Sequence, residues 1–465
     1  MGLTIANTNT LTLLNILSKT TANQTDSLTR LSTGFKINKG SDDPAGLIAV
    51  QSLSAELTGV EAAIANGQRA NTVLNTADGA LIEVGNLLSE IETLAAQSTS
   101  SGGLSPSEIA ANQAQIDNAI ESINRIVQTT SFNGKKLLDG QQSIRNTSDS
   151  TAQTDISDIR IFSRRTSQTN TTLTVNVTSA GAVASATVAN TTSVSAAEFT
   201  VAGNLGTATI VVTDSEALTS VRDKIISAAS ETGVSASVSG NELHLQSRTF
   251  GDDAFVSASH ISGDTDFTDV SYTTGTDAAV TVNGQTAFTD GLRVSFSSNG
   301  TSGEFFLTTA GNAAGSAGVV TVTGGGSTFQ LGTSTSTQAT LGIEALFSQD
   351  LGNSSDGYLT SLKSGGTNDL STNANNAVAV AKAALTQVAT QRGRIGGFQK
   401  FQVETSINSL NATKQALDEA RGVIRDTDFA LETAELARQN VLLQSGISLL
   451  GVASQQSSQI LSLLR

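Results

Sequence analysis

The chain has no cysteine and no tryptophan, only two prolines and one methionine, and aromatic residues make up 4% of its 465 positions. Without cysteine it has neither a disulfide framework nor a thiolate ligand for a metal ion. Acidic residues outnumber basic ones by 41 to 26, giving a formal net charge of -15. Nucleic acid and anionic membrane surfaces are bound by basic patches, so we expect neither as a partner. With so few large side chains, stability is expected to come from many small contacts along extended elements.

No long apolar run occurs at the start of the sequence. The first twenty residues, MGLTIANTNTLTLLNILSKT, lack a basic segment and hold their apolar residues in short clusters. They match neither a secretory signal peptide nor a membrane span. If the protein is extracellular, we expect it to leave the cell by another route.

Catalytic and metal-binding signatures are also missing from the sequence. The two histidines, His244 and His260, form no H-E-x-x-H pair, and we interpret them as surface or strand residues. The stretch GDTDFTD, residues 263–269, lacks the glycine and the distal glutamate of an EF-hand, so we interpret it as a solvated acidic turn rather than a calcium site. No phosphate-binding loop, dinucleotide fingerprint or nucleophile motif occurs. The sequence therefore predicts no enzyme, no cofactor and no metal site.

What the chain does have is a long helical pattern at its N-terminal end. From residue 14, positions spaced alternately by three and four form a heptad seam with a polar centre. These positions are Leu14, Leu17, Thr21, Gln24, Leu28, Leu31 and Phe35. A second helix is predicted from Pro44 to about Gln97, which at 1.5 Å per residue is about 80 Å long. A third follows Ser105, which forms a capping box with Glu108, and it ends before a tight turn at Asn133-Gly134.

The start of the second helix is marked by the stretch SDDPAG, residues 41–46. Pro44 suits the first helical position, where its missing N–H would have had no partner, and Asp43 can cap the helix. Asp42 and Asp43 also meet the positive end of the helix dipole. We therefore predict a sharp helix start here.

The C-terminal third repeats the helical pattern. A seam is predicted from Val378 to Ile424 with a glycine-containing slip at residues 393–397, and a last helix is predicted after the break RDTD at residues 425–428. The last helix carries Leu436, Asn440, Leu443, Ile447, Leu450, Ser454, Ser457, Leu461 and Leu464 on one seam. Seams with so many polar positions are poor at closing a two-helix core, so both terminal helices are expected to need more neighbours.

Charge is distributed unequally between the two ends. The first 40 residues hold four basic and one acidic group, a net +3, and the last 40 hold two basic and four acidic groups, a net -2. Opposite signs help to select a partner helix, although salt screens such pairs.

Between about residues 141 and 370 the pattern is that of strands. Segments such as TLTVNVT, ATIVVT and AVTVNGQTAF alternate with period two, and Asn283-Gly284 is a hairpin signal. One helix, with Leu218, Val221, Ile225 and Ala229 on one face, is followed by two short strand patterns, which predicts a small β-α-β-β unit. The fold class expected is α+β: long coiled-coil-like helices from both termini form a rod, and a mostly β outer insertion contains this unit.

Several of these segments together resemble bacterial flagellins, the subunits of the flagellar filament. The similar segments are NTNTLTLLNILSKT, RLSTGFKINKGSDDPAGLIAV, SFNGKKLLDG, RGVIRDTDFALETAELARQNVLLQSG and ILSLLR. They cover roughly the first 140 and the last 90 residues, in the right order. The β-α-β-β unit is similar to an insertion found in some flagellins and hook proteins, while the rest of the middle has no recognisable counterpart.

The resemblance implies a secreted, extracellular structural subunit that assembles with copies of itself into the filament used for motility. By resemblance, its other partners are an export chaperone, the filament cap and hook-associated proteins. Residues 1–40 with 430–465 would form the inner tube. Residues 41–145 with 325–429 would form a helical rod domain with β-hairpins around it, and 146–324 a variable, mostly β, solvent-facing region.

The resemblance also implies roles for particular residues. Self-assembly is expected to involve Leu14, Leu17, Leu28, Leu31, Leu436, Leu443, Ile447, Leu450, Leu461 and Leu464. Asp42, Asp43 and Pro44 would form the joint between the innermost helix and the next layer. In many flagellins the stretch corresponding to residues 88–97 carries arginines where this chain has Glu90 and Glu92, and a glutamate in place of Thr93, and it helps to form the site bound by an innate immune receptor. The altered stretch predicts weak or absent receptor activation.

Two other interpretations stay open. The first is a hook–filament junction protein, which has similar ends but usually matches the RDTDFA and ILSLLR segments less closely. The second is a surface adhesin or surface enzyme built on a flagellin frame, in which the β insertion binds or acts on something and the ends anchor it. The missing catalytic constellation weighs against the enzyme form.

Overall fold

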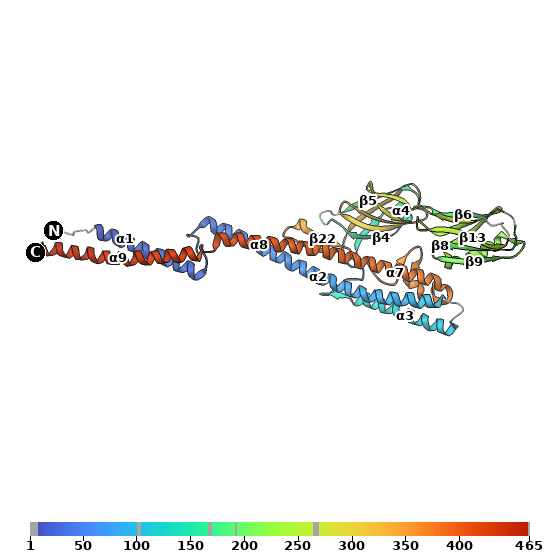
Figure 1. Ribbon diagram of the computed structural model, residues 1–465, viewed down its shortest axis with the longest axis horizontal. Helices are drawn as coiled ribbons and strands as arrows, with labels where there is room; N and C mark the ends of the chain where they lie inside the picture. The colour runs from blue at the N-terminus through green and yellow to red at the C-terminus, as the bar shows by residue number, and fades with distance from the viewer. Residues whose placement is uncertain (1–7, 100–103, 166–169, 191–192, 264–268, 464–465) are drawn as a thin grey trace. The chain divides into compact units, whose positions relative to one another are not determined.

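The computed structural model describes residues 8–99, 104–165, 170–190, 193–263 and 269–463 (Figure 1). Helices from both ends of the chain flank a β-rich middle, which confirms the predicted α+β class. The chain divides into two compact units, Met1–Ala65 with Ile407–Arg465, and Asn66–Ser406. We call them unit 1 and unit 2.

Unit 1 is helical. Helix α1 (Thr8–Thr33) and helix α9 (Phe429–Leu463) lie side by side (Figure 1), and the same unit contains the first part of α2 (Pro44–Ser98) and most of α8 (Thr405–Arg425). In this unit α2 and α8 are joined by an ion pair, with Lys414 Nζ 2.8 Å from Glu61 Oε1. The predicted start of α2 at Pro44 and the predicted break before α9 are both confirmed.

The helices of unit 2 are held together by apolar stripes. The rest of α2 buries Leu74, Ala77, Leu81, Val84, Leu88, Ile91 and Ala95 completely. This spacing of three and four is the one that keeps a single helix face turned inward. Helix α3 (Pro106–Thr129) buries its own isoleucine stripe, and its start has the predicted capping box of Ser105 and Glu108. The third long helix is α7 (Leu370–Phe398), whose start is capped by the carboxylate of Asp369.

The predicted slip in the C-terminal seam lies next to an irregular turn of helix. A π-helical segment, Gln399–Glu404, joins α7 to α8 directly after the glycines. A π-helical turn inserts one extra residue and so rotates the following seam relative to the preceding one. Gln399 Nε2 fixes the segment by donating to Asn75 Oδ1 of α2 at 2.8 Å.

The described residues of the β-rich middle form two hydrophobic cores. The core of the first β lobe is enclosed by two antiparallel sheets, with strand orders β16-β15-β5-β20-β3 and β17-β18-β19-β4. The strands are β3 (Ile144–Ser148), β4 (Ile156–Ser163), β5 (Thr171–Ser179), β15 (Ala279–Val282), β16 (Gln285–Thr286), β17 (Phe288–Asp290), β18 (Arg293–Ser298), β19 (Thr301–Leu307) and β20 (Gly315–Gly325), with the short helix α4 (Ser150–Asp155) between β3 and β4. Alternate residues of β5 are buried, as the period-two pattern predicts.

The second β lobe has strand orders β14-β13-β8-β9 and β11-β12-β6. Its elements are β6 (Val183–Asn190), β8 (Ala197–Gly203), β9 (Gly206–Val212), α5 (Leu218–Ser227), α6 (Ala229–Thr232), β11 (Val234–Ser239), β12 (Glu242–Phe250), β13 (Phe255–Gly263) and β14 (Val270–Thr274), with a short pair β7 (Ser193–Val194) and β10 (Glu216–Ala217). Helix α5 and the hairpin β11–β12 follow β9 in the chain. The expected β-α-β-β unit is not a single sheet, however, because β9 pairs with β8 and not with β11 or β12.

The two predicted Asn-Gly turns are confirmed. Asn133 and Gly134 have φ of 50° and 78° between β1 (Ser131–Phe132) and β2 (Lys135–Lys136). Asn283 and Gly284 have φ of 53° and 76° between β15 and β16. Positive φ at both residues is the requirement of the type I′ hairpin. The remaining short elements are the pairs β21 (Ser327–Gln330) with β22 (Gln338–Leu341) and β23 (Gly352–Asn353) with β24 (Gly357–Tyr358), and the 3₁₀ turns Thr335–Thr337 and Leu359–Leu362.

Within the described residues, α2 is long and apolar enough in composition to cross a membrane. Core helices of water-soluble proteins meet the same criterion. In unit 2 this helix already buries its apolar stripe inside the protein, so the criterion carries little weight here.

Candidate assembly site: the terminal helix pair and its joint

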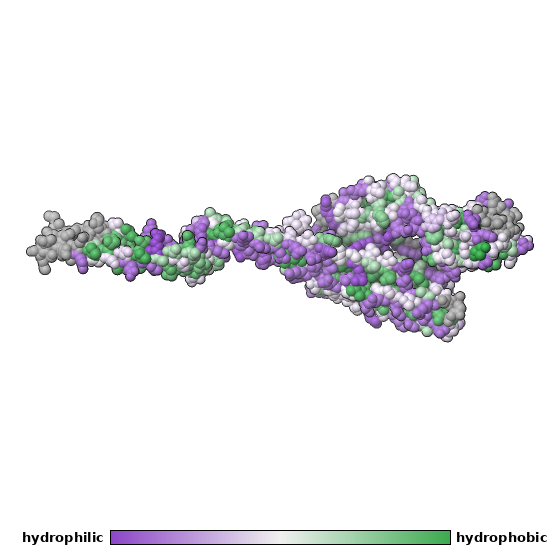
Figure 2. Space-filling view, in the orientation of Figure 1, coloured by the Kyte–Doolittle hydropathy of each residue, from purple (hydrophilic) through white to green (hydrophobic). Residues whose placement is uncertain are grey.

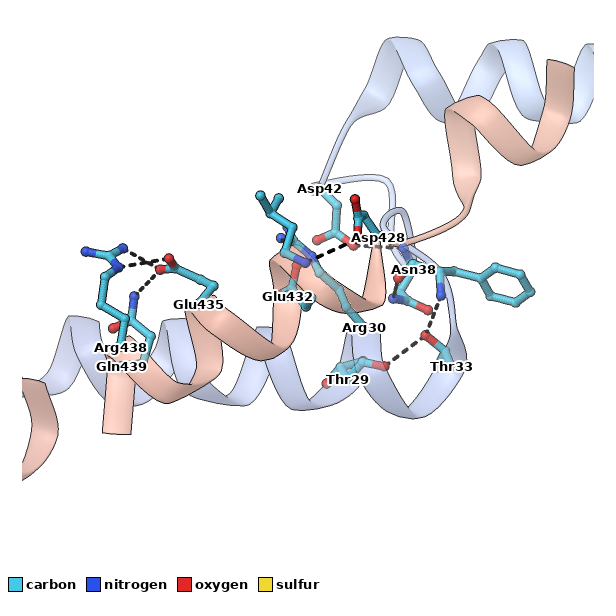
Figure 3. A network of polar contacts seen from close by, with 12 residues as sticks. Thr29, Arg30, Thr33, Asn38, Asp42, Asp428, Glu432, Glu435, Arg438 and Gln439 are labelled. Carbon is cyan, nitrogen blue, oxygen red and sulfur yellow. Dashed lines mark hydrogen bonds and ion pairs between the residues drawn. The ribbon is translucent and has the colours of Figure 1, made fainter. Parts of the chain in front are cut away.

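The antiparallel pair of α1 and α9 brings together the two ends of the chain. Gln24 Nε2 donates to Asn440 Oδ1 at 2.7 Å. Arg30 Nη1 lies 3.7 Å from Glu432 Oε2 (Figure 3). This ion pair links the basic N-terminal end of the chain to the acidic C-terminal end, as the opposite net charges of the two ends predicted. The arginine is partly exposed, so the pair contributes specificity more than stability.

The most deeply buried positions of this helix pair are polar. The side chains that are most deeply buried between the described parts of α1 and α9 belong to Thr20, Ser27, Glu432 and Gln439. Leu17, Leu31, Leu436, Leu443 and Leu450 are half-buried. A seam of small and polar residues gains little from the hydrophobic effect, because that effect scales with the apolar area removed from water.

The predicted seam differs from the buried one at every second position. Thr20 and Ser27 are buried, whereas the predicted Thr21 and Leu28 are exposed. On α9, Gln439 is buried and Asn440 is exposed in the same way. Neighbouring residues in a helix point about 100° apart, and a single partner helix covers only one edge of a wide apolar stripe.

The predicted self-assembly residues therefore fall into two groups. Leu17, Leu31, Leu436, Leu443 and Leu450 face the partner helix of the same chain, and Leu14, Leu28 and Ile447 do not. Ile447 and Leu28 keep 55% and 50% of their surface exposed. Leu461 belongs to α9, but the burial of its side chain is not described, and Leu464 lies outside the described residues.

Sequence reasoning missed many of the apolar residues on the outer face of this pair, which Figure 2 shows as green areas. The exposed large apolar residues of the two helices are Leu11, Leu14, Ile16, Leu28, Phe429, Leu431, Val441, Leu442, Ile447, Leu449 and Val452. Single exposed apolar residues are ordinary on a protein surface. A concentration of them on two adjacent helices is typical of a surface that another protein covers.

The stretch SDDPAG forms a tightly bonded connection. Asp43 accepts a hydrogen bond from the backbone N–H of Gly46 at 2.9 Å and so caps α2, which confirms the predicted helix start. Asp42 accepts hydrogen bonds from the backbone N–H groups of Asn38 and Lys39, both at 2.9 Å, and these bonds lower the pKa of its carboxyl group. A Cβ at position 46 would lie 2.5 Å from Asp43 Oδ2 and 2.7 Å from Ile37 Cδ1, so a larger residue than Gly46 would have to displace these two side chains.

This connection is bonded to the break between α8 and α9. The backbone N–H of Lys36 donates to the carbonyl of Arg425 at 2.6 Å, and Thr427 N–H donates to the carbonyl of Gly34 at 3.0 Å. The Arg425 guanidinium lies 3.6 Å from the centre of the Phe35 ring. Asp428 caps α9 by accepting from the N–H groups at the helix start. The sequence predicted both breaks, but it carried no signal that they pair.

The stretch proposed to resemble an immune-receptor site lies on α2 in unit 2. Glu90 and Thr93 are exposed and Glu92 is half-buried, while Leu88 and Ile91 of the same turns face the core. The three altered residues thus lie on the outer side of the helix. Another protein can contact these side chains without any change in the apolar stripe of α2 that faces the core.

The histidines and the acidic turn were interpreted as non-catalytic. In the second β lobe, His244 Nδ1 lies 2.9 Å from the Thr187 hydroxyl, and its Nε2 lies 3.2 Å from Glu242. The backbone N–H of His260 donates to Asp269 Oδ1 at 2.6 Å, whereas Asp264 and Asp266 of the acidic turn lie outside the described residues. Among the residues described, no group of three or more metal-ligating side chains is placed to hold an ion.

The terminal helices bury polar side chains most deeply and leave many apolar ones exposed, and they are joined to a β-rich middle with its own cores. These features define a structural subunit of a helical assembly. Residues 5–143 match the family model of the bacterial flagellin N-terminal helical region, and residues 378–464 match that of the C-terminal helical region. The B-type flagellin of Pseudomonas aeruginosa is 30% identical, with 94% of each chain aligned. The chain belongs to the bacterial flagellin family and is a subunit of the flagellar filament.

Other relatives agree with this assignment. Polar flagellin C of Vibrio parahaemolyticus is 25% identical over the full length of both chains. A solved structure of FliC from Burkholderia pseudomallei is 19% identical, covers 72% of this chain and 99% of that chain, and has a TM-score of 0.26. The flagellins of Pseudomonas aeruginosa and Vibrio parahaemolyticus match this chain over nearly its whole length, and neither the junction protein nor the adhesin is better supported.

Proposed function

We propose that the chain polymerises with copies of itself and that the outer faces of α1 and α9 are the contact surface. The observation that carries this proposal is the inverted distribution of side chains in the helix pair. Polar residues such as Thr20 and Gln439 are buried between the helices, while apolar residues such as Leu28 and Ile447 face outward. Helices from further copies would cover the apolar residues and supply the stabilisation that the pair alone lacks.

The three-part division predicted from the sequence is proposed for the polymer. Residues 1–40 with 430–465 would form the inner tube, 41–145 with 325–429 the surrounding helical layer, and 146–324 the solvent-facing part. Asp42, Asp43 and Pro44 would be the joint between the first two layers. The hydrogen bonds of Asp42 to Asn38 and Lys39 support this role, because they give the connection a defined geometry.

We further propose that the protein is exported from the cell and acts as a structural protein rather than an enzyme. An export chaperone, the filament cap and hook-associated proteins would be its other partners. Membership of the flagellin family supports these assignments. The low fraction of charged residues, 14%, and the lack of cysteine suit a chain that is exported and then folds outside the cell.

A separate proposal concerns recognition by animals. Glu90 and Glu92 place negative charge where many flagellins carry arginine, so a receptor surface complementary to arginine would meet like charge and lose bidentate hydrogen bonds. We expect this subunit to activate the receptor weakly or not at all.

The assembly proposal is tested by adding the purified full-length chain to short filament seeds and following their length by electron microscopy. Continued elongation by this chain alone supports a filament subunit. Binding to the seed end without elongation would favour the junction-protein alternative. If the folded chain neither binds nor elongates the seeds, the proposed contact surface is wrong.

A further inference from the structure

Charged side chains connect the first β lobe to helix α7 inside unit 2. Arg160 comes from β4, Glu304 from the neighbouring strand β19, and Arg394 from α7. The two carboxylate oxygens of Glu304 lie 3.4 Å from Arg160 Nη1 and 3.2 Å from Arg394 Nη2. The Glu304 side chain is only 8% exposed. One buried carboxylate thus joins an arginine of the lobe to an arginine of the helix.

Further contacts fix both arginines. The Arg394 guanidinium lies 3.0 Å from the centre of the Phe162 ring, which belongs to β4. Arg160 Nη2 donates to the carbonyl of Gly352 at 3.1 Å. Burial also lowers the pKa of Arg394 to about 10, so this arginine keeps its charge at neutral pH. The contact between the lobe and the helix therefore depends on charge at this point.

The segment after β22 lies between the same two parts. The Gly342 N–H donates to the carbonyl of Phe162 in the first β lobe at 2.7 Å, and the Gly342 carbonyl accepts from Gln391 Nε2 of α7 at 3.3 Å. Two residues later, the largely buried side chain of Glu344 has an oxygen, Oε1, that lacks a hydrogen-bond partner among the described residues. A buried carboxylate oxygen without a hydrogen bond destabilises the folded protein when the group is ionised.

The charged groups that act on Glu344 are Arg160 of β4, Arg394 of α7, Glu304 of β19 and Asp350 of the same loop. Burial raises the pKa of Glu344 to about 7, the two arginines oppose this rise, and the two acidic groups add to it. While Glu344 is protonated, the two arginines balance Glu304 and Asp350. Ionisation of Glu344 would add a negative charge without a matching partner.

We propose that this cluster is a proton-controlled latch, closed while Glu344 is protonated and loosened between the first β lobe and α7 when Glu344 ionises. An ionised Glu344 would compete with Glu304 for the same two arginines or draw water into the contact. Either event weakens the bonds that hold the lobe on the helix. A cleft of about 1230 Å³, whose walls include Arg160 and Glu304, lies beside the cluster and gives water a path to it.

The direction of the pH dependence follows from linkage. The pKa of Glu344 in the folded protein, about 7, lies above its usual value of 4.5. The protonated folded state is favoured, so the contribution to stability is complete below 4.5 and is lost as the pH rises through 7. The latch is therefore closed in mildly acidic medium and loosened in mildly alkaline medium.

Amide hydrogen exchange in the full-length, unpolymerised chain tests the proposal. The reporters are the N–H groups of Gly342, Ile343 and Leu346, which donate to carbonyls of residues 162, 142 and 138. After correction for the intrinsic pH dependence of exchange, their protection is expected to fall by up to about tenfold between about pH 6 and about pH 8, which is the change that the pKa difference allows over this range. Protection in the middle of α3 should stay constant.

Two variants make the test specific. Glu344→Gln keeps the size of the side chain but cannot ionise, so its reporters should keep the same protection at both pH values. Glu83→Gln, at an exposed position of α2 in the same unit, should behave like the unaltered chain. Reporter protection that does not change with pH in the unaltered chain, or the same pH dependence in Glu344→Gln, would overturn the latch.

A second measurement needs no variant and so does not depend on the folding of Glu344→Gln. Glutamate labelled with ¹³C at its side-chain carboxyl is titrated in the unaltered chain by NMR. One carboxyl with a midpoint near neutral pH supports the proposal. If every glutamate titrates close to the usual value of 4.5, the cluster is not a latch.

Discussion

Replacing Ile447 by glutamate should leave the subunit folded but block its polymerisation. Ile447 lies on α9 with 55% of its surface exposed, and Leu443 and Leu450 on the same helix provide the inner contacts with α1. A polar side chain at Ile447 therefore remains in water in the free subunit. Surface substitutions of this kind change the free energy of unfolding by less than about 0.5 kcal/mol.

The effect on the polymer is much larger if the outer face of α9 is covered there. Covering the exposed half of an isoleucine side chain is worth roughly 1 kcal/mol, which the variant loses. Burying a carboxylate without a partner adds a cost of several kcal/mol, unless the group takes up a proton. A total of about 3 kcal/mol corresponds to roughly a hundredfold increase in the subunit concentration needed for assembly.

The assay compares the amount of polymer sedimented from increasing subunit concentrations. Circular dichroism and gel filtration establish that the free Ile447→Glu subunit is folded, and Ile447→Leu is the matched control that should assemble normally. Filaments of Ile447→Glu at the concentration that suffices for the unaltered chain would refute the placement of this residue in a subunit contact.

Three other variants test different parts of the molecule. Leu81→Ala should lower the free energy of unfolding of unit 2 by about 2–5 kcal/mol in a denaturant titration, because Leu81 is fully buried; a loss below about 0.5 kcal/mol would contradict its place in the core. Gly396→Ala should raise the thermal midpoint of the free subunit, since no atom lies within 4 Å of the added methyl group and alanine is favoured in a helix by about 1 kcal/mol; an unchanged or lower midpoint would speak against the open space seen there. A subunit with Glu90→Arg, Glu92→Arg and Thr93→Glu should recover part of the receptor signal in reporter cells, and strong signalling by the unaltered monomer would show that these residues do not define the site.

Local sequence signals were sufficient to predict the helix boundaries and the tight turns. Pro44 with Asp43 determines the start of α2, Ser105 with Glu108 that of α3, and an Asn-Gly dipeptide the first hairpin. In each case the backbone conformation depends on residues within one turn of each other. Such features can be predicted from the sequence because the interactions that stabilise them form between residues close together in the chain.

The side of the terminal apolar stripe that is buried could not be predicted from the sequence in the same way. Leu28 fits the heptad pattern better than Ser27, yet Ser27 is the buried residue. Periodicity locates an apolar stripe, but the position of the partner helix decides which edge of the stripe is covered. If the stripe is wide enough for more than one partner, the sequence of one chain does not say which partner comes from the same chain.

The charge cluster in unit 2 depends on long-range placement. Arg160, Glu304 and Arg394 are separated by 144 and 90 positions in the sequence. They meet because β19 pairs with β4 and because α7 passes beside that sheet edge. Neither the strand partner nor the helix position has a local signal, so no motif search would have grouped these residues.

The two units differ in how they achieve stability. Unit 2 buries the apolar stripes of its helices and the cores of both β lobes, and residues such as Leu88 and Phe199 are fully buried. The contacts that stabilise unit 2 therefore form within one chain. In unit 1 the helix pair buries Thr20 and Ser27 and leaves Leu28 in water. In the proposed assembly, a pair built in this way would be weak alone and stronger when other copies add their apolar faces. The same residues would then keep the free subunit from closing its own apolar surface and would make assembly the step at which that surface leaves water.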